Sequence, residues 1–231
     1  MGGRVNSVFS KGLGPLSLSV LVLLSLPVLG AGTPGGLSPH EEELTRRIGF
    51  DPAVVLIVKQ EAAEHTVRRL VGFNEDGYQL LADGITATVR RERADRIRAA
   101  LRRKLLARRY LVFLADENEE TGTATIGVLR GGDQFEILRV MQTNGPHQDV
   151  KNEDVIEKLS SWHKRAPFEI IGAGYDWVEI EFLKLPGDMA GFVKDLYEFC
   201  PDAVDADGGA AEEKDMADRI SASRRLSLWW D

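Results

Sequence analysis

Apolar and polar residues alternate most clearly in two segments near the C-terminus, residues 177–183 and 226–230. Alternation with a period of two predicts β-strands, since successive side chains of a strand point to opposite sides. The apolar side carries Val178, Ile180, Phe182, Leu226, Leu228 and Trp230. The other side carries Trp177, Glu179, Glu181, Ser227, Trp229 and Asp231. We expect helices to cover the first side, which leaves two tryptophans beside carboxylates on the second.

Other segments show the three- and four-residue spacing of amphipathic helices or the short apolar runs of strands. We expect helices over 92–106 and 211–221, helices capped by Asp133 and by Asn152, and a helix that starts at Pro186-Gly-Asp188. We expect strands over 85–89, 110–115, 123–129 and 168–171. Residues 54–58 fit either a helix capped by Asp51 or a buried strand, and so short an apolar run does not separate the two.

The order of these elements predicts an α+β fold. We expect a mostly antiparallel sheet with helices packed on one face, and ferredoxin-like split β-α-β elements within it. The chain divides into a signal peptide (1–31), a flexible leader rich in Gly, Pro and Ser (32–39), an N-terminal α/β region (40–109) and a C-terminal domain (110–231).

The N-terminus has the three parts of a secretory signal peptide. Arg4 and Lys11 precede an apolar run over 16–29, and the small residues 30–32 follow. The run is shorter than the roughly 20 apolar residues of a membrane-spanning helix, so we expect no span after cleavage. These features predict an exported protein, periplasmic or secreted. A misassigned start codon or an uncleaved tail is the alternative.

The composition indicates a soluble globular protein but does not indicate an activity. The 231 residues are 43% hydrophobic and 28% charged, which is typical of a soluble globular protein. The net charge of −7 argues against a general binder of polyanions, and we expect no nucleic-acid partner. A single cysteine, Cys200, excludes an internal disulfide framework and any zinc site built from several cysteines.

The aromatic–acidic strand face is the main candidate for a ligand-binding site. Its members are Trp177, Glu179, Glu181, Trp229 and Asp231, with Tyr175 and Asp176 at the rim. Aromatic planes beside carboxylates can hold a sugar, a cationic group or the arginine of a partner. In the alternative, the N-terminal half covers this face, and both tryptophans belong to the core. The leading hypothesis is a non-enzymatic binding or interaction module. The sequence identifies neither its protein or small-molecule partner nor its oligomeric state.

Two arrangements would suit a hydrolase or transferase, which is the alternative function. Glu179 and Glu181 lie on one strand face, but acid–base catalysis needs carboxylates in unlike environments, which the sequence does not show. Cys200 could act as a nucleophile if His163 and Asp202 came near it. Its place at the end of a predicted helix disfavours a thiolate, so a buried structural cysteine is the other interpretation.

The sequence predicts no cofactor and no metal. The four histidines lack metal-ligand spacing, and the acidic segment Asp202, Asp205 and Asp207 departs from the spacing of a calcium-binding loop. A block of ten basic residues between positions 90 and 109 could contact phosphates, anionic lipid or an acidic partner. It also fits an ordinary amphipathic helix with a solvated face. An envelope-associated protein that uses this helix is a third hypothesis.

Several C-terminal motifs are specific to a family rather than to any chemistry. They are Phe199-Cys-Pro-Asp202, Leu228-Trp-Trp-Asp231, the Gly-Tyr-Asp-Trp turn over 174–177 that enters Val178-Glu-Ile-Glu-Phe182, and the segments 133–139 and 152–156. In these motifs the chain resembles the bacterial Domain of Unknown Function 4253 family, most strongly from about Tyr110 to the end. The resemblance implies an α+β fold and no established activity. One departure is Ala206-Asp207-Gly208, where relatives tend to have Gln-Gly.

Overall fold

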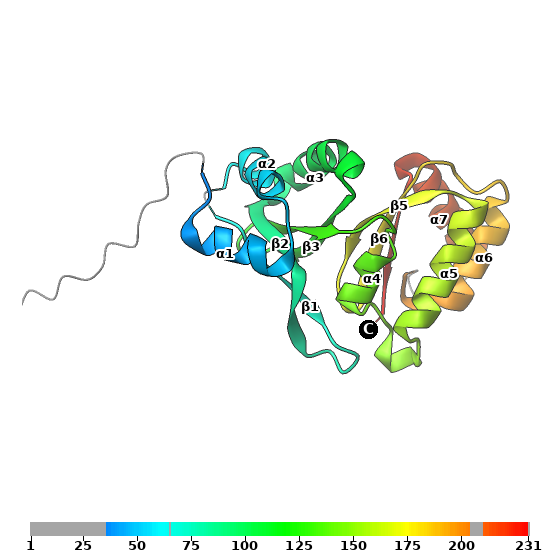
Figure 1. The fold of residues 1–231 in the computed structure, drawn as a ribbon. Helices are drawn as coiled ribbons and strands as arrows, with labels where there is room; N and C mark the ends of the chain where they lie inside the picture. The colour runs from blue at the N-terminus through cyan, green and yellow to red at the C-terminus, as the bar shows by residue number, and fades with distance from the viewer. Residues whose placement is uncertain (1–35, 65, 204–209, 231) are drawn as a thin grey trace, which may run out of the picture. The chain divides into compact units, whose positions relative to one another are not determined.

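The computed structural model describes residues 36–64, 66–203 and 210–230 (Figure 1). The predicted signal peptide lies outside these ranges, as do Asp205, Asp207 and Asp231. None of the helices in these ranges has both the length and the apolar composition of a transmembrane segment.

Seven strands of the described chain form one sheet in the order β1-β2-β4-β3-β5-β6-β7. The strands are β1 (Arg68–Phe73), β2 (Gln79–Arg90), β3 (Tyr110–Asn118), β4 (Thr123–Arg130), β5 (Phe168–Ala173), β6 (Trp177–Phe182) and β7 (Arg225–Trp229). Neighbouring strands are antiparallel except β3 and β5, which are parallel and register at the pair Leu114 and Gly172. β1 was not predicted from the sequence. The predicted boundary between residues 109 and 110 falls inside this continuous sheet.

Helices make three of the six connections between consecutive strands of the described chain, and two more helices precede β1. They are α1 (Pro39–Ile48), α2 (Pro52–Ala62), α3 (Arg91–Leu105), α4 (Glu136–Met141), α5 (Asn152–Arg165), α6 (Met189–Phe199) and α7 (Ala210–Ser223). Short 3₁₀ turns follow α3, α4 and α6, namely η1 (Leu106–Arg108), η2 (Pro146–Gln148) and η3 (Pro201–Ala203). The α+β class predicted from the order of elements is therefore confirmed.

Aspartates mark where two of these helices begin. Asp51 caps α2, because its carboxylate accepts a hydrogen bond from the Ala53 backbone N–H at 2.9 Å. Residues 54–58 are consequently helical, which decides between the two structures that the apolar run allowed. Asp188 caps α6 in the same way by accepting from the Gly191 backbone N–H at 2.9 Å.

Asn152 does not cap α5 as the sequence predicted. Lys151 occupies the N-cap position, and Asn152 is the first residue of the helix. The buried Asn152 amide instead donates hydrogen bonds to the backbone carbonyls of Leu138 and Thr143, both at 2.9 Å. A buried amide needs hydrogen-bond partners, and Asn152 finds them at the end of α4. These bonds link α5 to α4.

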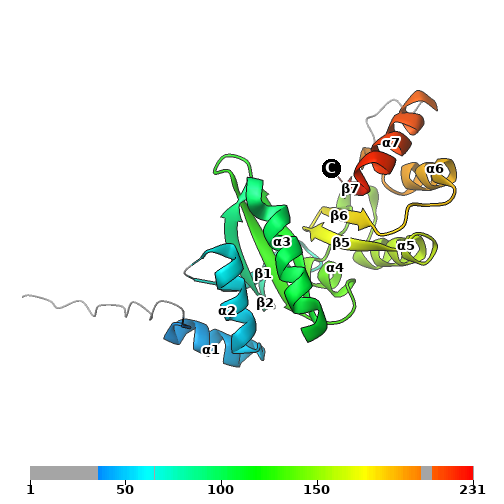
Figure 2. The same cartoon turned by 90° about the horizontal axis from the view of Figure 1, so that it is seen from above.

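A split β-α-β element is present in the N-terminal half, whereas the sequence predicted one from the order of elements in the C-terminal half. β2 and β3 are both antiparallel to β4, which lies between them, so β2 and β3 run parallel to each other. Helix α3 makes the connection from β2 to β3 and packs against β3 and β4. Figure 2 shows α3 along the strands of this half, with β5 and β6 to its side.

Two apolar cores lie on opposite faces of the sheet. Helices α1–α3 cover one face of β2, β3 and β4, where Val54, Ile85 and Leu101 are fully buried. Helices α4–α7 cover the other face, which continues across β5, β6 and β7 and contains Trp162 and Trp230. Helices thus lie on both faces of the whole sheet, whereas β5, β6 and β7 are covered on one face, as predicted for these strands.

A glutamine side chain completes the sheet where β3 and β5 separate. Gln134 Oε1 accepts a hydrogen bond from the Ile170 backbone N–H at 2.8 Å, and Gln134 Nε2 donates to the Phe168 carbonyl at 3.2 Å. These two backbone groups belong to the start of β5, beyond its registered contact with β3. The Gln134 amide therefore supplies the hydrogen bonds that a neighbouring strand would make, since buried backbone groups require hydrogen-bond partners.

Candidate functional site

β6 and β7 carry the aromatic–acidic face on the side of the sheet that α4–α7 leave uncovered. The register pairs Trp177 with Trp229, Glu179 with Ser227, and Glu181 with Arg225. The opposite side of both strands is buried in the core, and Val178, Ile180 and Leu228 are 0% exposed. The division of side chains that alternation predicted is therefore confirmed for the described residues.

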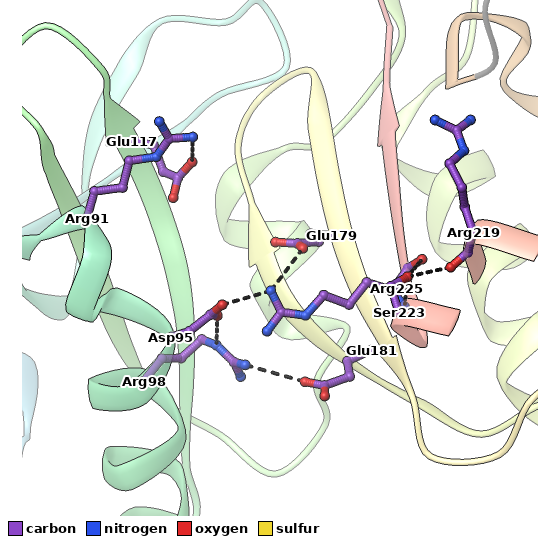
Figure 3. A network of polar contacts seen from close by, with 9 residues as sticks. All are labelled: Arg91, Asp95, Arg98, Glu117, Glu179, Glu181, Arg219, Ser223 and Arg225. Atoms are coloured by element: carbon purple, nitrogen blue, oxygen red, sulfur yellow. Dashed lines mark hydrogen bonds and ion pairs between the residues drawn. The ribbon is translucent and has the colours of Figure 1, made fainter. Parts of the chain in front are cut away.

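Helix α3 reaches this face through long charged side chains (Figure 3). Arg98 Nη2 lies 3.5 Å from Glu181 Oε2. Arg225, on β7, places Nη1 at 2.8 Å from Asp95 Oδ2 and at 3.7 Å from Glu179 Oε1. We call these five residues the α3 ion-pair network. Part of the predicted basic block is consequently engaged with the acidic strand face rather than free in solvent.

Arg98 occupies the most buried position of the α3 ion-pair network. Its side chain is 5% exposed, and Nε lies 3.7 Å from Asp95 Oδ1. Nε has no hydrogen-bond partner within the described part of the chain. A guanidinium withdrawn from water needs nearby opposite charge, because desolvation of an unpaired ion is costly. Arg98 therefore depends on the carboxylates of Asp95 and Glu181.

Next to this network lies an open hollow of about 320 Å³, which we call the acidic hollow. Its lining comes from three strands and consists of Leu114, Asp116, Glu117, Trp177, Glu179 and Ser227. Glu117 lies 3.4 Å from Arg91 Nη2, whereas Asp116 forms no ion pair with any residue that the structure describes. The acidic hollow thus combines three carboxylates with one aromatic ring.

Two glycines of β5 and its turn make room for the ring of Trp177. A Cβ at Gly172 would lie 2.8 Å from Trp177 Cζ3, and a Cβ at Gly174 would overlap Nε1. The indole therefore lies against bare backbone and is half-buried. The sequence allowed Trp177 to be either a ligand-binding surface residue or a core residue. The structure shows features of both, because the indole packs on β5 and also lines an open hollow.

The carboxylates of this region have different environments. Burial raises the pKa of Glu179, and the positive charge of Arg225 offsets part of that rise. Burial also acts to raise the pKa of Asp95, but the hydrogen bond and charge of Arg225, together with Arg98, outweigh it and hold that pKa below its ordinary value. Arg225 therefore pairs mainly with Asp95, at 2.8 Å, and lies farther from Glu179, at 3.7 Å.

The remaining described residues that were predicted for this face do not line the acidic hollow. Tyr175 packs on Phe73 with ring centroids 5.3 Å apart, and its hydroxyl donates to the Glu75 carbonyl at 3.2 Å. Tyr175 therefore packs against the β1–β2 hairpin and stabilises its turn. Asp176 is exposed, and Trp229 is 39% exposed without lining the hollow. Asp231 lies outside the described residues.

Cys200 is a buried thiol in contact with the last strand. Its side chain is 0% exposed, and Sγ donates to the Trp229 carbonyl at 3.1 Å. Burial raises the pKa of Cys200 to about 11. These properties are typical of a structural cysteine and unfavourable for a thiolate nucleophile.

His163 has partners of its own, different from those of Cys200. Its Nδ1 accepts a hydrogen bond from the Phe168 backbone N–H at 3.2 Å and lies 3.4 Å from Gln134 Nε2. Asp202 accepts a hydrogen bond from the side chain of Gln148. No group of three or more His, Cys, Asp or Glu side chains is placed to hold a metal ion within the described ranges.

The sequence pattern does not predict several residues of this region. Asp116 and Glu117 follow a predicted strand and read as an acidic turn. Their approach to Trp177 depends on the parallel contact of β3 with β5, which joins segments far apart in the chain. Asp95 and Arg225 are separated by 130 residues, and no local pattern pairs them.

Comparison with known proteins identifies a family but no activity. No curated protein and no solved structure matches this chain. Trp177, Glu179 and Ser227 lie within the segment that matches a family model, whereas Leu114, Asp116 and Glu117 precede it. Residues 125–231 match the family described as Domain of unknown function (DUF4253), which confirms the family that the C-terminal motifs predicted.

Proposed function

We propose that the protein is an exported, non-enzymatic binding module whose ligand or partner places a cationic group in the acidic hollow. The observation that carries this proposal is the convergence of Asp116, Glu117 and Glu179 beside the ring of Trp177 in one open hollow of about 320 Å³. The cationic group can be an arginine or lysine side chain of a protein, or a small amine.

The charges around the hollow favour a cation over a neutral ligand. Asp116 forms no ion pair with a described residue. Burial raises the pKa of Glu179, and the nearby charges of Asp95 and Glu117 act in the same direction. A cation beside Glu179 would favour the ionised carboxylate. The half-buried indole of Trp177 adds a surface over which a guanidinium or ammonium group can bind.

Titration with model compounds tests this proposal. We expect N-acetyl-arginine amide to shift the amide signals of residues in β3 and β6, and the uncharged N-acetyl-citrulline amide to leave them unchanged. Asp116→Asn and Trp177→Leu should each weaken binding about fivefold, the upper range for one exposed charge or a cation–π contact. Glu42→Gln removes an exposed charge from α1 and serves as the matched control.

Equal binding by Asp116→Asn and the unchanged protein would contradict the proposed site. Binding of citrulline and arginine derivatives with the same affinity would contradict the proposed ligand class. Thermal unfolding of each variant separates loss of binding from loss of structure.

Export forms part of the same proposal. It is supported by the basic residues, apolar run and small residues at positions 4–32. We expect the mature protein to begin at Ala31 or Gly32 when it is recovered from the exported fraction and its N-terminus is sequenced. Recovery of the intact chain from the cytosol alone would contradict export.

The alternative function is a hydrolase or transferase that uses Glu179 with Glu181. One observation favours it: burial raises the pKa of Glu179, while Glu181 lies 3.5 Å from Arg98, so the two carboxylates differ in environment. Turnover of a substrate that disappears in Glu179→Gln and persists in Glu42→Gln would support it. The version with Cys200 and His163 is disfavoured by the buried thiol and its raised pKa.

A further inference from the structure

A second charged hollow, of opposite sign, lies near the start of β3. It measures about 430 Å³ and is lined by Arg108, Arg109, Arg130, Gly131, Gly132 and Glu136. We call it the basic hollow. Asp116 and Glu117 of the acidic hollow lie near the other end of the same strand, roughly 20 Å away at the rise of an extended chain.

The arginines of the basic hollow are less compensated than those of α3. Arg108 Nη1 lies 3.3 Å from Asp51 Oδ2, an exposed pair. Arg130 donates to the Gly49 carbonyl at 3.3 Å, and neither Arg109 nor Arg130 forms an ion pair with a described residue. By contrast, the network around Arg98 holds its arginines among carboxylates. Three arginines beside the single carboxylate of Glu136 leave a net positive charge in the hollow, which in a chain of net charge −7 favours an anion there.

The backbone holds Arg109 against the glycine pair. Arg109 has a φ of 62°, ends η1, and accepts a hydrogen bond from the Gly131 backbone N–H at 2.9 Å. A Cβ at Gly132 would lie 3.1 Å from Arg109 Nη2, which is a tight approach. The guanidinium therefore lies over bare backbone at Gly132, and a larger residue there would displace it.

We propose that the basic hollow binds the phosphate group of a small molecule or lipid. Guanidinium groups present planar forks of N–H donors that match phosphate oxygens, and several of them can share the two charges of a phosphate monoester. Arg108, Arg109 and Arg130 come from two segments. The Glu136 carboxylate lies over Gly131 and the Arg109 guanidinium over Gly132, so three arginines share the hollow with one carboxylate. This site does not depend on the acidic hollow or on the function proposed for it.

A neighbouring cavity bears on the source of the phosphate. The basic hollow shares Gly132 with a cavity of about 420 Å³ at the separation of β3 and β5. Its apolar lining includes Leu106, Leu111, Phe135, Phe168 and Leu183. Leu106 is 51% exposed and Leu183 is 58% exposed, so apolar surface extends to the outside. A phosphate ester with an acyl or alkyl chain could occupy both spaces.

The test measures binding of inorganic phosphate and of octyl phosphate to the purified protein at constant ionic strength. We expect saturable binding, weakened about fivefold or more by Arg109→Ala and by Arg130→Ala. Arg103→Ala is the matched control, because it removes an exposed arginine of α3 that does not line the hollow. It should change the dissociation constant less than about twofold.

Gly132→Ala keeps every arginine and tests geometry alone. We expect weaker phosphate binding with an unchanged thermal midpoint, since the new methyl group lies 3.1 Å from Arg109 Nη2 and shifts the guanidinium by a few tenths of an ångström. Tighter binding of octyl phosphate than of inorganic phosphate would assign the site to a lipid or acyl phosphate, and equal affinities would assign it to a small phosphate. Absence of saturable binding to both, or equal weakening by Arg103→Ala, would overturn the proposal.

Discussion

Arg225 on the last strand and Asp95 on helix α3 form an ion pair in which Nη1 and Oδ2 are 2.8 Å apart. The two residues are 130 positions apart in the chain. Their contact joins the helix that covers β2–β4 to the uncovered side of β5–β7. Two charged segments that looked independent in the sequence, a basic helix and an acidic strand, are thereby parts of one arrangement.

The buried position of Arg98 predicts an asymmetry between two substitutions. The Arg98 side chain is only 5% exposed, and Glu181→Ala removes one of the carboxylates that compensate its charge. We expect this substitution to lower the free energy of unfolding by about 1–3 kcal/mol. Arg98→Met removes the buried charge and retains the packing of the chain, so its cost should be smaller. Urea unfolding measures both. A larger loss in Arg98→Met would contradict this account.

The raised pKa of Glu179 predicts how its replacement changes stability with pH. A carboxyl whose folded-state pKa lies above its unfolded value binds more protons in the folded protein, so its contribution to stability falls as pH rises through that interval. Glu179→Gln should therefore gain stability relative to the unchanged protein as pH rises from about 4 to neutrality. Thermal midpoints across this range test the sign. Asp95→Asn should show the opposite trend, because the Asp95 pKa is lowered.

The buried thiol predicts that Cys200 resists alkylation. With Sγ 0% exposed and a pKa raised to about 11, iodoacetamide at pH 8 should leave the native protein unlabelled and modify it fully in denaturant. A Ser221→Cys variant places a second thiol on the exposed side of α7 and should label in the native state at that position. Mass spectrometry identifies the labelled residue. Rapid labelling of Cys200 in the native protein would contradict this prediction and support the hypothesis of a cysteine nucleophile.

The hydrogen bonds of Gln134 to β5 predict that its replacement destabilises the start of this strand. Gln134→Ala leaves the Ile170 N–H and the Phe168 carbonyl without their partner, and we expect a loss of about 1–3 kcal/mol. The Ile170 amide should also exchange its hydrogen faster with solvent. Gln60→Ala, at an exposed position of α2, is the control and should change stability little. Unchanged exchange at Ile170 would show that another group replaces the Gln134 amide.

Local pattern was sufficient for most elements of the described chain. Alternation placed Val178 and Ile180 in the core and Glu179 on the other side, because strand geometry fixes that division wherever one face is buried. Helical spacing located α3, α5 and α6 for a similar reason. β1 was missed, since its segment Arg68–Phe73 lacks clear alternation and pairs with β2 around a bulge.

The candidate site was predictable only in part. The sequence named Trp177 and Glu179, both of which line the acidic hollow, but it also grouped Tyr175 with them, and Tyr175 packs on Phe73 instead. It did not name Asp116 or Glu117. These residues join the site through the parallel contact of β3 with β5, for which the local sequence carries no signal.

Local spacing and contiguous motifs in the sequence are sufficient to predict the α+β class, the family of residues 125–231 and the two sides of β6 and β7. Which charges compensate each other depends on the packing of distant segments. That packing places Arg98 and Arg225 among carboxylates, leaves Arg109 and Arg130 without ion pairs among the described residues, and brings Asp116 to Trp177. Electrostatic energy depends on distance and burial in space, and neither quantity is encoded by the position of a residue along the chain.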